Sequence, residues 1–95
     1  SIHQIRLEIQ PTEGDFYNIV SGSGAVTVTL PGNSGLTDGT IFYIKRGYGM
    51  TNNVTVTVAD VNAEMIDGDS SIVLESALAA VQVFWDSTAG NWAVF

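Results

Sequence analysis

Apolar and polar residues alternate along much of the chain, and an alternation with a period of two residues is the pattern of a half-buried β-strand. The clearest runs are Val-Thr-Val-Thr-Leu at residues 26–30 and Val-Thr-Val-Thr-Val at residues 54–58. Shorter strands are predicted at residues 5–9, 16–20, 40–46, 71–75, 81–85 and 92–95, between segments rich in Gly, Pro, Asn and Asp. Eight short strands at this spacing predict an all-β protein, built as a small antiparallel β-sandwich or an open barrel.

Residues 79–95 are the most aromatic stretch and are predicted to form a β-hairpin. The loop between its two apolar runs is longer than two residues, so Gly90 is expected to take the left-handed conformation that closes it. Trp85 and Trp92 lie in the arms of the hairpin at positions that fit packing in the core or in an interface. Asp67-Gly68 is expected to form a second tight turn.

Three of the predicted strands, at residues 40–46, 81–85 and 92–95, carry large apolar side chains on both faces. A strand of a two-layer sandwich has one inward and one outward face. Contiguous apolar area on an outward face usually marks an interface. The pattern therefore predicts a homo-oligomer, and we expect a homotrimer with cyclic symmetry. The candidate interface residues are Ile5, Leu7, Ile9, Phe42, Ile44, Tyr48, Met50, Phe84, Trp92 and Phe95.

The composition and the net charge restrict the kinds of partner that this chain is expected to have. The 95 residues make one domain, and cysteine is absent, so disulfides and most structural zinc sites cannot stabilise it and partner subunits are the expected stabiliser. The net charge of −7, with three basic residues, argues against a nucleic-acid partner because such a surface repels phosphate. No apolar run is long enough to cross a bilayer, and the first residues show no basic region followed by an apolar core. We expect neither membrane insertion nor a targeting signal.

No arrangement of residues predicts catalysis. His3 is the only histidine, and no Gly-x-Ser-x-Gly motif accompanies it, so nothing indicates a Ser-His-Asp triad. The ten carboxylates are typical of a solvated surface, and the distances between them cannot be derived from the sequence. We therefore expect a protein that is not an enzyme, with no catalytic residues and no cofactor.

A calcium loop begins at residue 60 but is not completed. Asp60, Asn62 and Glu64 place oxygen ligands at the first, third and fifth positions of such a loop. Met65 then stands where the loop requires glycine, and a serine occupies the position of the bidentate glutamate. We expect no metal site, with structural calcium as the minor alternative.

Exposed aromatic residues raise the alternative of sugar binding. Trp85, Trp92 and Tyr48 are the residue types from which carbohydrate-binding modules build a stacking platform. The two tryptophans lie within strands and favour the core. Tyr48 lies with Met50 in a predicted exposed loop at residues 47–53, so it is the better candidate for an external contact.

Several segments carry, in order, the motifs of one known module. They are VTVTLP at 26–31, GTIFYIKR at 39–46, NVTVTV at 53–58, MIDG at 65–68, AVQVFWD at 80–86 and GNW at 90–92. In this order they resemble a module that recurs in bacteriophage virion proteins, chiefly tail-fibre and other appendage or surface proteins. The resemblance covers residues 24–95 and leaves the first twenty residues unmatched.

The resemblance implies a compact, usually trimeric, non-enzymatic building block on the surface of a phage particle, with no catalytic residues to carry over. We expect residues 1–20 to form an N-terminal strand or arm and residues 21–95 the virion module, together one compact domain. A capsid decoration (cement) protein is favoured because the chain is short and has no coiled coil or collagen-like stalk. A tail-fibre or spike module and a carbohydrate-binding (receptor-binding) module are the alternatives. The implied partners are capsid or tail proteins of the virion and, for the last alternative, a surface glycan.

The N-terminal segment has two interpretations. Ile5, Leu7 and Ile9 form an apolar face that ends before Pro11. The strand either completes its own sandwich or bridges to an adjacent subunit or shell protein by β-addition, with Arg6 near an acidic partner surface.

Overall fold

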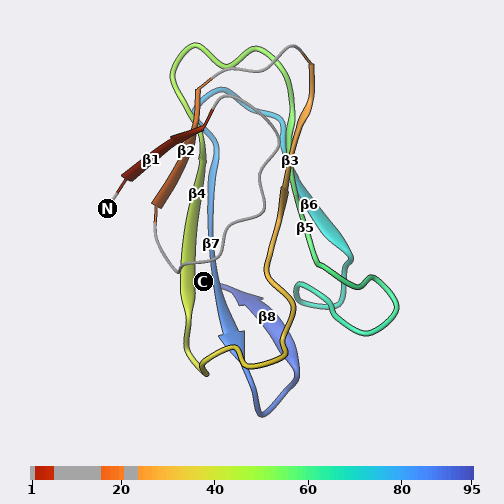
Figure 1. Cartoon of the computed structure of the whole chain (residues 1–95). Coiled ribbons are helices and arrows are strands. Elements are labelled where there is room, and N and C mark those ends of the chain that lie inside the picture. The colour runs from red at the N-terminus through yellow and green to blue at the C-terminus, as the bar shows by residue number, and fades with distance from the viewer. Residues whose placement is uncertain (1, 6–15, 21–23) are drawn as a thin grey trace.

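The computed structural model describes residues 2–5, 16–20 and 24–95. All regular secondary structure in this part of the chain is β-strand, as predicted, and it contains no helix that could cross a membrane. The strands are β1 (Ile2–Ile5), β2 (Phe16–Ile19), β3 (Val26–Thr29), β4 (Ile41–Arg46), β5 (Val54–Thr57), β6 (Ser71–Leu74), β7 (Ala80–Asp86) and β8 (Asn91–Val94) (Figure 1).

The strands form a five-stranded sheet of order β1-β2-β4-β7-β8 and a three-stranded sheet of order β3-β5-β6. Both sheets are mixed: β1, β2 and β4 are parallel, as are β3 and β5, while the remaining neighbours are antiparallel. The prediction of a purely antiparallel fold is therefore wrong. From β2 to β5 the chain changes sheet at every step, so strands two steps apart become neighbours and run in the same direction.

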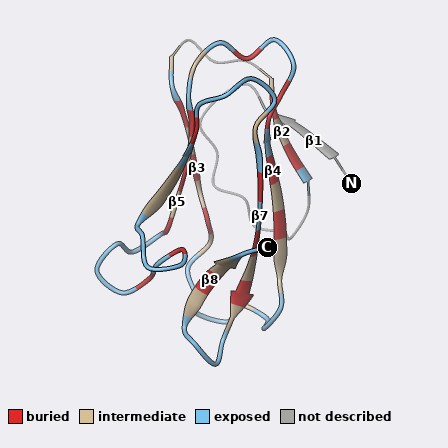
Figure 2. Cartoon of the chain, turned by 180° about the vertical axis from the view of Figure 1, so that it is seen from behind, coloured by how far each residue is buried: buried red, intermediate tan, exposed pale blue. Residues whose placement is uncertain are grey.

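One cluster of buried hydrophobic side chains draws its members from both sheets. In β3 and β5 the valines are buried in this cluster and the threonines are only partly covered, because successive residues of a strand point to opposite faces. Figure 2 shows the same alternation of buried and less buried residues along the strands of the five-stranded sheet. The largest fully buried side chains are Trp92, Phe42, Ile19, Leu30, Ile44, Ile66, Val28, Val54, Val56 and Val83.

The predicted hairpin is confirmed as β7 and β8, with Trp85 opposite Trp92. Gly90 closes the loop at a φ of 65°, the left-handed conformation expected for it. The carboxylate of Asp86 accepts hydrogen bonds from the backbone N–H groups of Thr88 and Ala89, at 3.1 and 3.2 Å. The loop is thus held by its own first residue, which explains how a local sequence signal sufficed to predict it.

The turn at Asp67-Gly68 is also confirmed and has a second role. Both residues have positive φ, 47° and 91°, and Ile66 bridges to Asp69 across the turn. Ile66 also bridges in parallel to Trp92 of β8, and the Asp67 carboxylate accepts the Val94 N–H at 2.9 Å. The turn therefore covers part of the outer edge of β8, which would otherwise present unpaired backbone groups.

The described part of the N-terminal segment belongs to the five-stranded sheet. β1 pairs in parallel with β2, and β2 pairs in parallel with β4. Tyr17 and Ile19 of β2 are buried in the common core, so β2 packs together with strands that follow residue 20. Of the two interpretations of the N-terminal segment, the pairing of β1 with β2 corresponds to a strand that completes its own sheet. Leu7 and Ile9 lie outside the described residues, as does Arg6.

Candidate functional site

The face of the five-stranded sheet that points away from the core carries a continuous row of aromatic rings. We call Phe16, Tyr43, Phe84 and Phe95 the outer aromatic row. Phe16 stacks on Tyr43 with ring centroids 4.3 Å apart and planes 13° from parallel. Phe95 meets Tyr43 and Phe84 edge to face, at 6.3 and 5.7 Å. Phe16 and Phe95 remain 49% and 53% exposed, so the row offers apolar surface to a partner.

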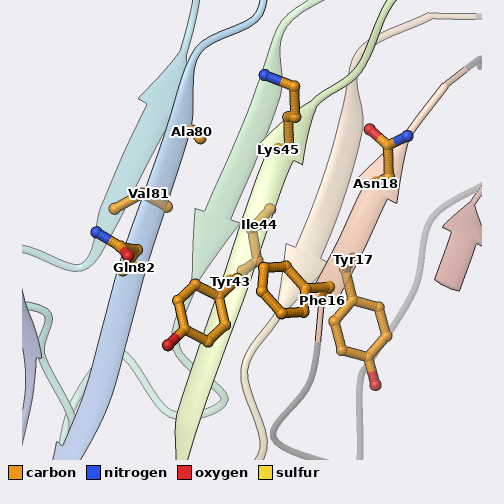
Figure 3. Close-up of a pocket in the computed structure, with 9 residues that line it drawn as sticks. All are labelled: Phe16, Tyr17, Asn18, Tyr43, Ile44, Lys45, Ala80, Val81 and Gln82. Atoms are coloured by element: carbon orange, nitrogen blue, oxygen red, sulfur yellow. The ribbon is translucent and has the colours of Figure 1, made fainter. Parts of the chain in front are cut away.

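A groove of about 410 Å³ lies beside the stacked pair (Figure 3). It crosses β2, β4 and β7, whose pairing places Phe16 beside Tyr43 and Lys45 beside Ala80. The small side chain of Ala80 leaves room between its larger neighbours. The residues that line the groove are Phe16, Tyr17, Asn18, Tyr43, Ile44, Lys45, Ala80, Val81 and Gln82.

Two polar side chains at the groove are held in place by backbone carbonyls. The Lys45 ammonium donates to the Leu78 carbonyl oxygen at 2.9 Å, and the Gln82 amide donates to the Phe95 carbonyl oxygen at 2.9 Å. An ammonium has three N–H donors, so Lys45 can also bind an anionic group of a partner. The lining residues include no carboxylate and no histidine. The stacked rings and the Lys45 ammonium make the groove suited to stacking and to pairing with an anionic group.

Leu78 stands next to the groove in a strained conformation. Its φ is 62°, which is unfavourable for a bulky residue that is not glycine, and its side chain is 50% exposed. Such strain costs on the order of 1–3 kcal/mol and is often found where a side chain serves an external contact. Leu78 thus extends the apolar surface beyond the sheet.

Seven of the ten candidate interface residues separate into two groups, and the side chains of Ile5, Leu7 and Ile9 lie outside the described part of the chain. Phe42, Ile44, Met50 and Trp92 are buried in the core of their own chain. Their side chains are covered by their own chain while the domain stays folded, so these side chains are not interface contacts. The prediction failed for them because alternation shows that two faces of a strand are apolar but not which face is covered. Phe84, Phe95 and Tyr48 reach the surface, Tyr48 with 87% of its area exposed.

The loop after β4 is less exposed than predicted. Met50 is buried, and its N–H donates to the Gly47 carbonyl oxygen at 3.1 Å. Gly47 donates to the Ile19 carbonyl oxygen at 2.8 Å, and a side chain at this position would collide with Asn18 of β2. Glycine is needed here because the loop lies directly on β2.

The partial calcium motif is a structural clasp instead. Glu64 is buried, and its two carboxylate oxygens accept the N–H groups of Asn33, at 2.7 Å, and Asp60, at 3.0 Å. These bonds tie together the loops that follow β3 and β5. In residues 16–20 and 24–95, no group of three or more His, Asp or Glu side chains could hold a metal ion.

The tryptophan platform proposed for sugar binding does not exist in the fold. Trp85 and Trp92 are buried, which confirms the prediction that they pack in the core. Phe42 and Trp92 meet edge to face with centroids 5.7 Å apart. The indole N–H of Trp92 is buried without a hydrogen-bond partner, so this side chain contributes through packing alone.

Sequence reasoning missed several groove residues: Phe16, Asn18, Tyr43, Lys45, Ala80 and Gln82. Strand parity already placed Tyr43 opposite to Phe42. What it could not reveal is that β2 lies beside β4, and β4 beside β7, because these pairings join distant parts of the chain.

No family model matches this chain, and a comparison with curated proteins likewise finds no match. The functional argument therefore rests on the residues and the geometry described above. The resemblance to phage virion modules stays a prediction.

Proposed function

We propose that this protein is a non-enzymatic structural component of a phage virion, and that it coats or clamps the capsid as a decoration (cement) protein. Its two sheets pack as a β-sandwich, and three copies associate. The outer aromatic row is the observation that carries the proposal, because its half-exposed rings leave contiguous apolar surface that a partner would cover.

The energetic gain from association is large relative to the stability of a small domain. Covering the exposed half of one phenylalanine ring removes on the order of 100 Å² from water and contributes about 2.5 kcal/mol. Phe16 and Phe95 are each about half exposed. Covering both rings would therefore contribute about 5 kcal/mol to association. This is comparable with the lower end of the 5–15 kcal/mol that stabilises a typical domain.

The three-stranded sheet supports a directional arrangement. Its face away from the core carries Thr27 and Thr29 beside Thr55 and Thr57. Threonine is mostly found at protein surfaces, and the Thr57 hydroxyl donates to the Ser70 carbonyl oxygen of its own chain at 3.1 Å. A protein with one aromatic face and one threonine face can bury the first in an assembly and keep the second in water.

The test is to isolate the virus particles encoded by the genome that carries this sequence. Peptide mass spectrometry should find the chain in those particles, and a density map should locate three copies together on the capsid. Light scattering of the purified chain should give a trimer. Location on the tail would favour the tail-fibre or spike alternative, and absence from purified particles would contradict a virion role.

A carbohydrate-binding module is the second candidate, and the groove is the specific observation in its favour. The stacked rings of Phe16 and Tyr43 lie near Lys45 and Gln82, a combination of apolar surface and hydrogen-bond donors that suits a sugar ring. Glycan binding that is lost in Tyr43→Ala but kept in the control Tyr48→Ala would favour this function. Tyr48 is the matched control because it is exposed and does not line the groove.

A further inference from the structure

A ring of three copies restricts how the outer aromatic row can be covered. Contact of the same patch with itself produces a two-fold dimer, whereas a three-fold ring requires two different surfaces on each copy. The outer aromatic row and its groove supply one surface. The second must lie elsewhere on the chain and must also expose apolar side chains.

The loop between β5 and β6 fits this requirement. Val61 is 59% exposed in that loop. Figure 1 shows the loop projecting on the right, while β2 and β4, which carry the groove, lie on the left. Val73, another exposed apolar residue, belongs to the strand β6 in the sheet that carries the threonine face. A groove accepts a side chain on a projecting loop better than a side chain on the flat face of a sheet. This favours Val61 over Val73.

The same loop is held in a defined shape. The buried Glu64 carboxylate accepts the Asp60 N–H, and the Asp60 carboxylate accepts the Asn62 N–H at 2.9 Å. The Ala63 and Glu64 N–H groups both donate to the Asp60 carbonyl oxygen, at 3.1 and 2.8 Å. A loop that is already ordered loses little conformational entropy on binding, so Val61 is presented at low cost.

The charges of the two surfaces are complementary. Of the two basic residues in the described part of the chain, Arg46 is buried and Lys45 is exposed at the groove. Asp60 precedes Val61 and is exposed, with one carboxylate oxygen engaged by the Asn62 N–H. The remaining carboxylate oxygen can accept a hydrogen bond from a lysine of another copy.

We propose that the loop at residues 59–63 of one copy docks into the groove of the next copy. Val61 lies over Ala80 between the larger groove residues, and Asp60 pairs with Lys45. Leu78, strained and exposed beside the groove, covers the docked loop. This inference rests on the trimer in the proposed function and assigns the two surfaces that form it.

A charge-exchange experiment tests the assignment in the full 95-residue chain. Lys45→Glu should weaken the trimer about tenfold or more, because it places a carboxylate against Asp60. The double variant Lys45→Glu/Asp60→Lys should recover most of this loss. Lys45→Glu/Asp69→Lys is the matched control: it has the same net charge, but Asp69 lies outside the docked loop, so the trimer should stay weak. Analytical ultracentrifugation measures the trimer at a series of concentrations.

A second variant removes the apolar contact without touching the clasp. Val61→Ser should weaken the trimer about tenfold while thermal unfolding of the monomer changes little, because Val61 is exposed in the free chain. The control Val73→Ser should leave the trimer intact.

The outcomes separate this inference from the proposed function. A wild-type trimer that tolerates both Lys45→Glu and Val61→Ser overturns the docked loop but leaves the assembly standing. Equal recovery with Asp69→Lys shows that net charge alone acts, and this also overturns the pairing. A wild-type chain that stays monomeric or forms a two-fold dimer overturns the inference and the proposed trimer together. A trimer that still binds a sugar in the groove overturns the docked loop, since the groove would be filled.

Discussion

The two faces of the five-stranded sheet carry matching sets of aromatic residues with opposite fates. On the core face, Tyr17, Phe42, Trp92 and Trp85 form a row with ring centroids 6.0, 5.7 and 5.5 Å apart. On the outer face, Phe16, Tyr43, Phe95 and Phe84 form a row with centroids 4.3, 6.3 and 5.7 Å apart. The core row is buried, whereas two members of the outer row are about half exposed.

The comparison separates stability from association. Adjacent residues such as Phe42 and Tyr43 differ little in chemistry, yet one is covered by its own chain and the other faces outward. The rings of the core row stabilise the fold through packing. The exposed area of the outer row contributes hydrophobic free energy only when another surface covers it. A residue's parity in the strand, and not its type, therefore decides which property a mutation changes.

The largest effect is expected in the core row. Trp92→Ala removes a fully buried indole and should lower the free energy of unfolding by about 3–5 kcal/mol. Trp92→Phe should cost less, because the indole N–H has no partner to lose. Urea unfolding followed by circular dichroism measures both. A midpoint that hardly moves in Trp92→Ala would contradict the core position.

The outer row should respond in association instead. Phe95→Ser should weaken association by about 2–3 kcal/mol per interface, which is within the range of interface hot spots. The unfolding free energy of the isolated chain should change by about 1 kcal/mol or less, because Phe95 is about half exposed. Light scattering over a dilution series checks the first value and urea unfolding the second. An unchanged trimer would show that the outer row is not the interface.

The threonine face of the three-stranded sheet is the internal control, and its expected effect is small. Thr55 lies between Thr27 of β3 and Val73 of β6. The substitution Thr55→Ser should change the unfolding free energy by about 0.5 kcal/mol or less. Association should not change. If this variant dissociates the trimer while Phe95→Ser does not, the roles of the two sheets are exchanged.

The smallest effect is expected at Asp38, in the segment that connects the two sheets between β3 and β4. The Ser87 N–H donates to the Asp38 carboxylate at 2.8 Å. This backbone hydrogen bond, together with one from the Ser87 side chain, lowers the pKa of Asp38 below its ordinary value of 3.8. A lowered pKa stabilises the folded state above about pH 3.8, and the contribution is lost as the pH falls through the folded-state pKa.

Asp38→Asn should therefore lower the melting temperature slightly near neutral pH. The difference from the wild type should shrink as the pH falls below 4, because the wild-type carboxylate is then protonated as well. Melting curves between about pH 6 and pH 2 measure it. A difference that stays constant over this range would show that the Asp38 charge does not contribute.

The sequence by itself determined the local features of this protein. The alternation at residues 26–30 and 54–58 predicted β3 and β5, and Asp67-Gly68 and Gly90 predicted their turns. These signals can be detected because side-chain parity and turn conformation depend on neighbouring residues along the chain. The apolar character of both faces of β4 was detectable for the same reason.

Only the tertiary structure decided which strands are neighbours and which apolar face is covered. It placed Phe16 on Tyr43, buried Met50, and turned Glu64 from a candidate ligand into a clasp between two loops. It also made β2 parallel to β4 by passing the chain through the other sheet between them. These features join residues far apart in the chain, and a period of two residues contains no information about which distant strand will lie alongside.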